Sequence, residues 1–415
     1  MDFVLYVAVA FFPLDEELGL LGGSYYTPSL QEAMTRLGAK LPYEQAREEI
    51  NQFCHTLVSE PTIRRQTTGN GRAGEAIAKA ETRQVERGEI SSEAQPSRIL
   101  ISADGAYIAL TSGEWREIKT LSIGEFETVI QADGSEKIQT GSLSYFSRSY
   151  RARDFEYYAL PEVHRRGVVN AGAVVTVNDG AEWIQNFVDY HCHDAVRILD
   201  FPHAQGYLAD AGKVVYGEET DNFQAWFREC SHTLKHTGSQ DILSNLEQFR
   251  QQVDQIQDRE IIETSLAYLR KREPMINYPH FLKQGYPIGS GCVESAHKVV
   301  VQSRMKQAGM RWAEANVDPM LALRNLICND RWNQGWQQIV TYRRQQQLKN
   351  HRHKCRLALQ SLVATAPHKP IQPTPPTSTP IKTNSDPPSP KQTHRPAADH
   401  PWRHSPVGRA RFQKS

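Results

Sequence analysis

Long apolar runs are missing from this sequence. Its start, MDFVLYVAVAFFP, is apolar over about a dozen residues, whereas a transmembrane helix needs about 20. The same run lacks the basic residues that open a secretion signal. No other stretch is long and apolar enough to cross a bilayer. The sequence therefore predicts a protein that is not embedded in a membrane and has no signal peptide.

Close pairs of cysteines and an excess of one charge are missing too. The six cysteines are scattered, at positions 54, 192, 230, 292, 328 and 355. They indicate neither a zinc knuckle nor a disulfide framework, which fits a reducing cytoplasm. The 48 basic and 47 acidic side chains nearly cancel, so the net charge indicates no class of partner. With 415 residues the chain can form two or three domains around a sizeable core.

The first patterned segment, residues 28–68, has apolar residues at helical spacing. Within it, VSEPTIRRQT predicts a new helix, with Ser59 as its N-cap and Pro61 in its first turn. Short helices before one that bears Arg64 and Arg65 resemble a helix-turn-helix, although an ordinary helical subdomain would give the same pattern. We expect a helical DNA-binding domain over 25–70, after an N-terminal lead over 1–24. A charged linker, or an exposed helix, follows over 71–97.

An α/β pattern begins at residue 98. Five short apolar runs predict strands, namely RILISAD, EWREIKTL, SLSYFSR, AVVTVND and AVRILD. Helical segments lie among them, one of them bent at Pro161. Three strands followed by alternating strands and helices indicate an α/β core over 98–203. Residues 204–284 carry two stripes of apolar residues at helical spacing, and Ile256 is the last residue of the second stripe. This pattern predicts an all-α insertion.

The core is expected to resume over 285–330, with a helix that presents Glu294. A second helix there would have Asp318 as its N-cap and Pro319 at its first position. Residues 331–365 predict a basic helical region. The tail over 366–415 is rich in proline, threonine and serine and is expected to be disordered.

Four carboxylates form a candidate site. Asp104, Asp179 and Asp200 each follow an apolar run, and side chains at the ends of adjacent strands can converge. Taken singly, each Asp is more simply explained as a turn former. Glu294 opens a later helix, where it could merely complement the helix dipole. Together the acids suit phosphodiester cleavage with two Mg²⁺ or Mn²⁺ ions, which favour carboxylate ligands.

Basic residues follow Glu294 in GSGCVESAHKVVVQSRMKQAGMRW. Lys298 lies one helical turn beyond Glu294, where it could meet a phosphate. Arg304, Lys306 and Arg311 continue the series, so the segment either contacts a DNA backbone or forms a solvated face. The IGSG sequence lacks the spacing of a nucleotide-phosphate loop, and its glycines suit a tight entry to the helix.

These motifs resemble a known family. The stretches ISADGAYIAL…EWREIKTL, VNDGAEWI, LDFPHAQGYL and the Glu294 segment are similar, in order, to DDE transposases of bacterial insertion sequences. The nearest resemblance is to the Kra-type family, allied to Mutator-like transposases, over residues 10–345. It implies an RNase H-like core in which Asp104, Asp179 and Glu294 are the catalytic, metal-binding acids. Asp200 with His203 matches the Asp-x-x-His signature that supports such a site; His203 would bond to Asp200 or ligate the metal.

The resemblance implies a transposase that cleaves element ends and joins the freed 3′-OH to target DNA. It implies Mg²⁺ or Mn²⁺, a homodimer or larger synaptic complex on DNA, and a location at the bacterial nucleoid. Two alternatives stay open: a related metal-dependent nuclease without strand transfer, and an inactive DNA-binding remnant. The start also departs from the family, because DFVLYVAVA has no cysteine where relatives often carry one. A truncated or frameshifted start would explain this departure, and it puts in doubt any N-terminal metal site and the activity itself.

Overall fold

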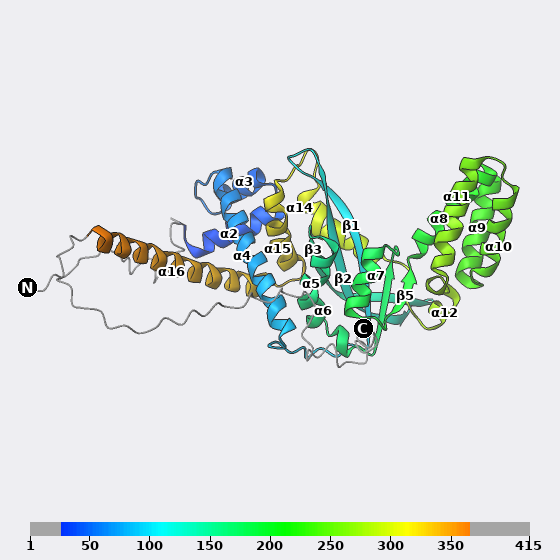
Figure 1. The fold of residues 1–415 in the computed structure, drawn as a ribbon, viewed down its shortest axis with the longest axis horizontal. Helices are drawn as coiled ribbons and strands as arrows, with labels where there is room; N and C mark the ends of the chain where they lie inside the picture. Colours follow the sequence, from blue (N-terminus) through cyan, green and yellow to red (C-terminus); the bar gives the residue numbers. More distant parts are fainter. Residues whose placement is uncertain (1–25, 366–415) are drawn as a thin grey trace, which may run out of the picture.

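The computed structural model describes residues 26–365 and shows an elongated α/β protein. A central sheet separates two helical regions (Figure 1). Helices α2–α4, α15 and α16 lie at one end, and helices α8–α12 lie at the other. The predictions for the N-terminal lead over 1–24 and for the tail over 366–415 concern residues outside the described ones. Among the described helices, none combines the length and apolar character needed to cross a membrane.

The sheet is mixed and has five strands in the order β3-β2-β1-β4-β5. The strands are β1 (Arg98–Ala109), β2 (Trp115–Ile130), β3 (Glu136–Arg148), β4 (Ala173–Asn178) and β5 (Val196–Leu199). Strands β1, β2 and β3 are antiparallel neighbours, whereas β4 runs parallel to both β1 and β5. All five apolar runs therefore form strands, as the sequence predicts, and the fourth lies beside the first. The short run of β4 is buried because both of its faces are covered.

Two apolar cores cover the two faces of the sheet. On one face, Ile99 and Ile101 of β1 pack with Phe155 and Phe187. These aromatic residues come from α5 (Ala152–Tyr158) and α7 (Glu182–His191), and α6 (Leu160–Arg165) completes the layer. Pro161 lies in the first turn of α6, so the predicted bend is a break into two short helices. On the other face, Leu100 of β1 belongs to the core shared with the insertion.

The insertion is helical, as predicted. It consists of α8 (Phe201–Tyr216), α9 (Asp221–His236), α10 (Gln240–Gln252), α11 (Ile256–Lys271) and α12 (Tyr278–Lys283). Leu208, Leu234 and Leu246 are buried where these helices meet. Ile256 does not continue the predicted stripe, because it is the first residue of α11 and its side chain is 73% exposed.

The N-terminal helices are α2 (Pro28–Lys40), α3 (Tyr43–Phe53) and α4 (Glu60–Glu86). Ser59 is the N-cap of α4, as predicted. The predicted boundary at residue 70 is wrong, since α4 continues without a break to Glu86. Of the two alternatives for the charged stretch, a linker or an exposed helix, the helix is correct up to Glu86. It is only partly exposed, because buried small residues, including Gly71 and Ala73, pack closely against α15.

The helices after the insertion are α13 (Gly291–Ala296), the π-helical η3 (His297–Gln302), α14 (Ser303–Met305), the 3-10 turn η4 (Glu314–Asn316), α15 (Val317–Cys328) and α16 (Trp332–Thr365). Two more 3-10 turns lie earlier in the chain: η1 (Val168–Asn170) before the insertion and η2 (Glu273–Met275) within it. Asn316, not Asp318, is the N-cap of α15. The carboxylate of Asp318 instead accepts hydrogen bonds from the backbone N–H and the hydroxyl of Ser149, at 2.7 and 2.6 Å.

Candidate functional site

The first two candidate acids, Asp104 and Asp179, lie just beyond the point where the parallel pairing of β1 with β4 ends. Parallel pairing of β1 with β4 stops at Ile101 and Thr176. Just beyond, the Asn178 side-chain oxygen accepts a hydrogen bond from the Ala103 backbone N–H at 2.6 Å. Asp104 and Asp179 are the next residues on the two strands, so this bond fixes the spacing of their backbones.

Asp104 is not at a strand end, contrary to the sequence prediction. β1 continues for five residues past it, because the antiparallel partner β2 extends equally far and pairs Asp104 with Thr120. An apolar run ends at Asp104, but a strand ends where its hydrogen-bonded partner ends. Asp179 and Asp200 do follow the last residues of β4 and β5 directly.

Three of the candidate acids influence one another electrostatically. Burial raises the pKa of Asp104 above its ordinary value, and the charges of Asp179 and Glu294 raise it further. The Gly105 backbone N–H, 2.7 Å from the Asp104 carboxylate, and the His297 side chain act in the opposite direction. The fold therefore brings together the three acids that the sequence singled out, from β1, the end of β4 and α13.

These side chains do not converge into a closed coordination cage. Within residues 26–365, no group of three or more His, Cys, Asp or Glu side chains stands close enough to hold a metal ion by itself. Carboxylate oxygens are nevertheless the ligands that Mg²⁺ and Mn²⁺ prefer, and Mg²⁺ keeps several waters instead of demanding a cage of protein atoms. In chemical type, the donors Asp104, Asp179 and Glu294 fit such an ion.

The insertion holds the loop that carries Asp179. From α11, the Tyr268 hydroxyl donates to the Asp179 backbone oxygen, and Arg272 donates to the Gly180 oxygen at 2.8 Å. The Arg272 guanidinium stacks on the Tyr268 ring at 3.6 Å. Gly180 has a φ of 76°, and a Cβ atom there would collide with Arg272. Sequence reasoning missed Tyr268 and Arg272, because their distance along the chain gives no sign that they contact this loop.

Asp200 connects the beginning of the insertion to its end. It is the N-cap of α8, where one carboxylate oxygen accepts from the His203 backbone N–H at 3.0 Å. The other oxygen accepts from the Ser290 backbone N–H, just before α13, at 2.7 Å. Asp200 therefore supports the Glu294 helix through backbone contacts. The predicted bond from Asp200 to the His203 imidazole is wrong, since that ring lies against Tyr207 and Tyr268.

Glu294 is exposed on α13, and the π-helical turn η3 follows it at once. Arg324 of α15, only 6% exposed, satisfies carbonyl groups of that turn. Its guanidinium donates to the Val300 oxygen at 3.1 Å and also to the Val299 oxygen. π-Helical turns occur frequently at functional sites. Here the turn determines how the acid-bearing helix continues.

Arg304 is not a DNA contact, although the sequence predicts one. Its side chain is 1% exposed, its Nε donates to the Gly38 oxygen at 2.9 Å, and it stacks between the Tyr43 and Trp312 rings. Burial lowers its pKa to about 10. Arg324 likewise donates to the Ala39 oxygen, at 3.2 Å. The two arginines thus cap the C-terminal carbonyls of α2 and attach the N-terminal helices to the candidate site.

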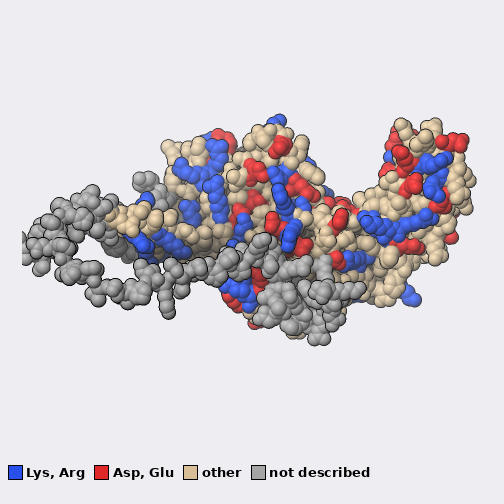
Figure 2. All heavy atoms as spheres, viewed as in Figure 1, with Lys and Arg blue, Asp and Glu red and all other residues tan. Residues whose placement is uncertain are grey.

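The other predicted DNA contacts are exposed. Lys298, Lys306 and Arg311 follow Glu294 along the chain, and Arg64 and Arg65 lie on α4. Figure 2 shows basic side chains over the N-terminal helices, along α16 and over the insertion, with acidic side chains among them. A polyanion could reach these five side chains without any rearrangement of the fold.

His297 is a further residue that sequence reasoning missed. It is 5% exposed, and its Nε2 atom has no hydrogen-bond partner within the described residues. Burial lowers its pKa, while the neighbouring Asp104 acts to raise it. Its position three residues after Glu294, about one helical turn, was the signal that could have identified it.

The fold and the site define a mixed α/β protein with three mutually interacting acids beside a helical insertion. Residues 9–337 match the uncharacterised protein family UPF0236, and the chain belongs to this family. A comparison with curated proteins finds no match.

Proposed function

We propose that this protein is a DDE transposase with an RNase H-like core. The order of strands and acids carries the proposal. The first acid lies on β1, the second follows β4, which neighbours β1, and the third lies on a helix after an all-α insertion. This is the order that the resemblance to insertion-sequence transposases implies, and the mutual effect of the three acids on the Asp104 pKa supports it.

In this proposal Asp104, Asp179 and Glu294 hold two Mg²⁺ or Mn²⁺ ions. When bound, such ions clamp the attacking and leaving oxygens of a phosphodiester. Because the pKa of Asp104 is raised and a carboxylate must be deprotonated to bind metal, metal affinity should weaken as the pH falls. Asp200, Tyr268 and Arg272 do not touch the reacting atoms in this scheme.

The chain's own side chains would hold the DNA. Lys298, Lys306 and Arg311 are exposed near the Glu294 helix and would contact phosphates. Arg64 and Arg65 on α4 would contact the element's ends. Joining two ends requires both in one assembly, so a homodimer or a larger synaptic complex is expected.

Two alternatives differ in their products. A metal-dependent nuclease of the same fold would nick DNA without strand transfer, and an inactive remnant would only bind it. The purified protein is incubated with DNA carrying the ends of its element, a target plasmid and Mn²⁺. Strand-transfer products support the proposal, nicking alone supports the nuclease, and binding alone supports the remnant.

Point variants then test the assignment of the acids. Asp104→Asn, Asp179→Asn and Glu294→Gln should each abolish cleavage at every Mn²⁺ concentration, because each removes charge from the metal site. Asp210→Asn is the matched control, since Asp210 is exposed on α8. Cleavage by the Asp179→Asn variant together with an inactive Asp200→Asn variant would identify Asp200 as the ligand instead.

A further inference from the structure

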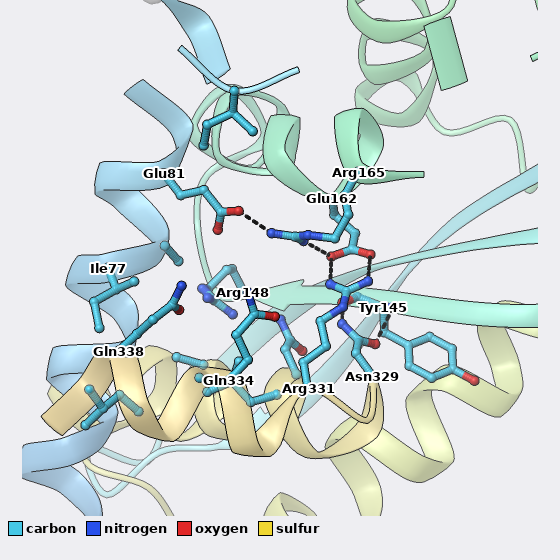
Figure 3. Close-up of a pocket in the computed structure, with 18 residues that line it drawn as sticks. Ile77, Glu81, Tyr145, Arg148, Glu162, Arg165, Asn329, Arg331, Gln334 and Gln338 are labelled. Carbon is cyan, nitrogen blue, oxygen red and sulfur yellow. Dashed lines mark hydrogen bonds and ion pairs between the residues drawn. The ribbon is translucent and has the colours of Figure 1, made fainter. Parts of the chain in front are cut away.

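A separate cavity lies between the N-terminal helices and the sheet. Its volume is about 380 Å³, within the range of small-molecule sites. Helices α4, α6, α15 and α16 and strand β3 contribute its lining (Figure 3). None of the candidate acids Asp104, Asp179 and Glu294 is among the lining residues, so the cavity is distinct from the site described above.

Most of the charge around the cavity is paired. Arg331 binds the buried Glu162 carboxylate through two hydrogen bonds, of 2.5 and 2.8 Å. Arg165 joins the same carboxylate at 2.9 Å and reaches Glu81 on α4. Figure 3 shows the two acids and two bases joined in a continuous series of ion pairs along one wall of the cavity. These four side chains neutralise one another and leave no charge for a ligand.

Arg148 is the lining residue whose charge is not paired. Its side chain is 3% exposed, and no carboxylate within the described residues lies within ion-pair distance of it. One nitrogen of its guanidinium donates to the Ser147 oxygen at 2.7 Å. The Asn325 side-chain oxygen, in the amide orientation that satisfies both of its neighbours Arg148 and Ser147, accepts from the same nitrogen at 2.9 Å. Glu75 lies within electrostatic range but is bonded to Lys79 and Tyr150.

The Phe146 ring, 4.8 Å from the Arg148 guanidinium, and two carbonyl oxygens offset part of the cost of burying this charge, but no carboxylate neutralises it. The lining has three arginines and only two glutamates, so it carries one positive charge in excess. Apolar side chains of Ile77, Leu326 and Ile339 form other parts of the wall, and the amides of Gln334 and Gln338 stand beside them. The cavity thus combines one cationic point with apolar surfaces and neutral polar groups.

We propose that this cavity binds a small organic anion, with its carboxylate or phosphate on Arg148 and an apolar body between α4 and α16. Arginine suits both groups because its planar fork matches their oxygens. A ligand there contacts α4, α16 and the sheet at once, so it would stabilise the docking of the N-terminal helices. The proposal does not depend on the transposase assignment.

Calorimetric titration of the full chain tests this site. Benzoate is the carboxylate probe, phenyl phosphate is the phosphate probe, and benzamide is the neutral control of the same size as benzoate. We expect saturable binding of at least one anion and none of benzamide. The tighter of the two anions identifies the preferred head group. If neither anion binds at millimolar concentration, the proposal is overturned.

Two variants locate the binding. Arg148→Met removes the charge at similar volume and should weaken anion binding about tenfold or more, as expected for losing a charged hydrogen-bond donor. Because Arg148 is buried, that variant could fail to fold. Gln338→Trp changes an exposed α16 residue and fills the cavity with an indole ring, so it should abolish binding in a folded protein. Anion binding that is unchanged in Gln338→Trp would overturn the site.

Discussion

Asp200 shows how a single carboxylate can support a site without touching a substrate. Both of its oxygens accept backbone N–H groups, one at each end of the insertion. In Asp200→Asn the new amide group would face one of those donors. We expect a loss of about 1–3 kcal/mol in unfolding free energy, measured by urea denaturation. Cleavage should fall about 10–100-fold without vanishing. Unchanged stability would contradict the capping role, and Asp210→Asn serves as the control.

A second residue-scale prediction concerns pH. His191 is buried, its Nε2 lies 2.8 Å from the Glu156 oxygen, and burial lowers its pKa from 6.5 to about 3. Between these two pKa values, His191 is protonated in the unfolded chain and neutral in the folded protein. The effect of His191 on the free energy of unfolding is therefore negligible above pH 6.5. As the pH falls from 6.5 towards 3, this one histidine lowers the free energy of unfolding by up to about 1.4 kcal/mol per pH unit.

The matched comparison uses two histidine variants. His191→Phe should flatten the slope of unfolding free energy against pH between 4 and 6.5, whatever its absolute stability. His232→Phe changes an exposed histidine on α9 and should leave the slope unchanged. Equal slopes for the wild type and His191→Phe would show that His191 is not responsible for the pH dependence.

At the residue scale, motif order and chemistry pointed to Asp104, Asp179 and Glu294. These acids influence one another in the structure, and their catalytic role stays a prediction. Arg304 was misassigned because a basic residue in a series looks the same whether it is solvated or buried against aromatic rings. His297, Tyr268 and Arg272 depend on contacts between distant segments, which local patterns do not contain.

At the scale of elements, η3 depends on one side chain from another helix. Arg324→Met would leave the Val299 and Val300 carbonyls without their guanidinium donor, and the Ala39 carbonyl as well. The Val299 oxygen keeps the Ser303 hydroxyl as a donor, at 2.8 Å. We expect faster hydrogen exchange over residues 297–305 and a loss of unfolding free energy of about 1–3 kcal/mol for each carbonyl that is left unsatisfied. Arg228→Met changes an exposed arginine on α9 and should alter neither. Unchanged exchange over 297–305 in Arg324→Met would argue against this role.

The contact between α4 and α15 gives another element-scale prediction. A Cβ atom at Gly71 would collide with the backbone of Pro319. Gly71→Ala should therefore destabilise the protein, although alanine is the better helix former. Gly206 on α8 is the matched control, because nothing lies within 4 Å of its missing Cβ. Gly206→Ala should stabilise by about 0.5–1 kcal/mol. Thermal melting distinguishes the two, and a stabilised Gly71→Ala would contradict the close packing.

Strands and insertion helices were predictable because their apolar periodicity is strong and local. For the second half of α4 the sequence left a linker and an exposed helix open, since its buried positions include small residues such as Gly71 and Ala73, which resemble a linker in composition. The π-helical η3 has no sequence signature of this kind, because Arg324, which donates to its Val299 and Val300 carbonyls, comes from α15. An element that relies on a distant donor cannot be predicted from its own residues.

For the whole molecule, DNA binding is expected to involve α4. Arg64 and Arg65 are exposed, so replacing both with alanine should leave the fold intact. Affinity for element ends should fall, and the slope of log affinity against log salt should become less steep by about one to two. Binding is measured by fluorescence anisotropy over a range of salt concentrations. Unchanged affinity and slope would favour the basic part of α16, residues 342–356, as the DNA contact.

The insertion leaves and re-enters the core at nearly the same place. Asp200 and Ser290 are 90 positions apart in the chain yet hydrogen-bonded, and Phe201 bonds to the Ile288 oxygen beside them. A segment with joined ends can lengthen or shorten at its outer tip without moving its anchors. The turn at residues 253–255, between α10 and α11, should therefore accept a reporter domain or natural length variation. Related chains are expected to differ in length most at such outer turns, while Asp200 and the Glu294 helix keep their spacing.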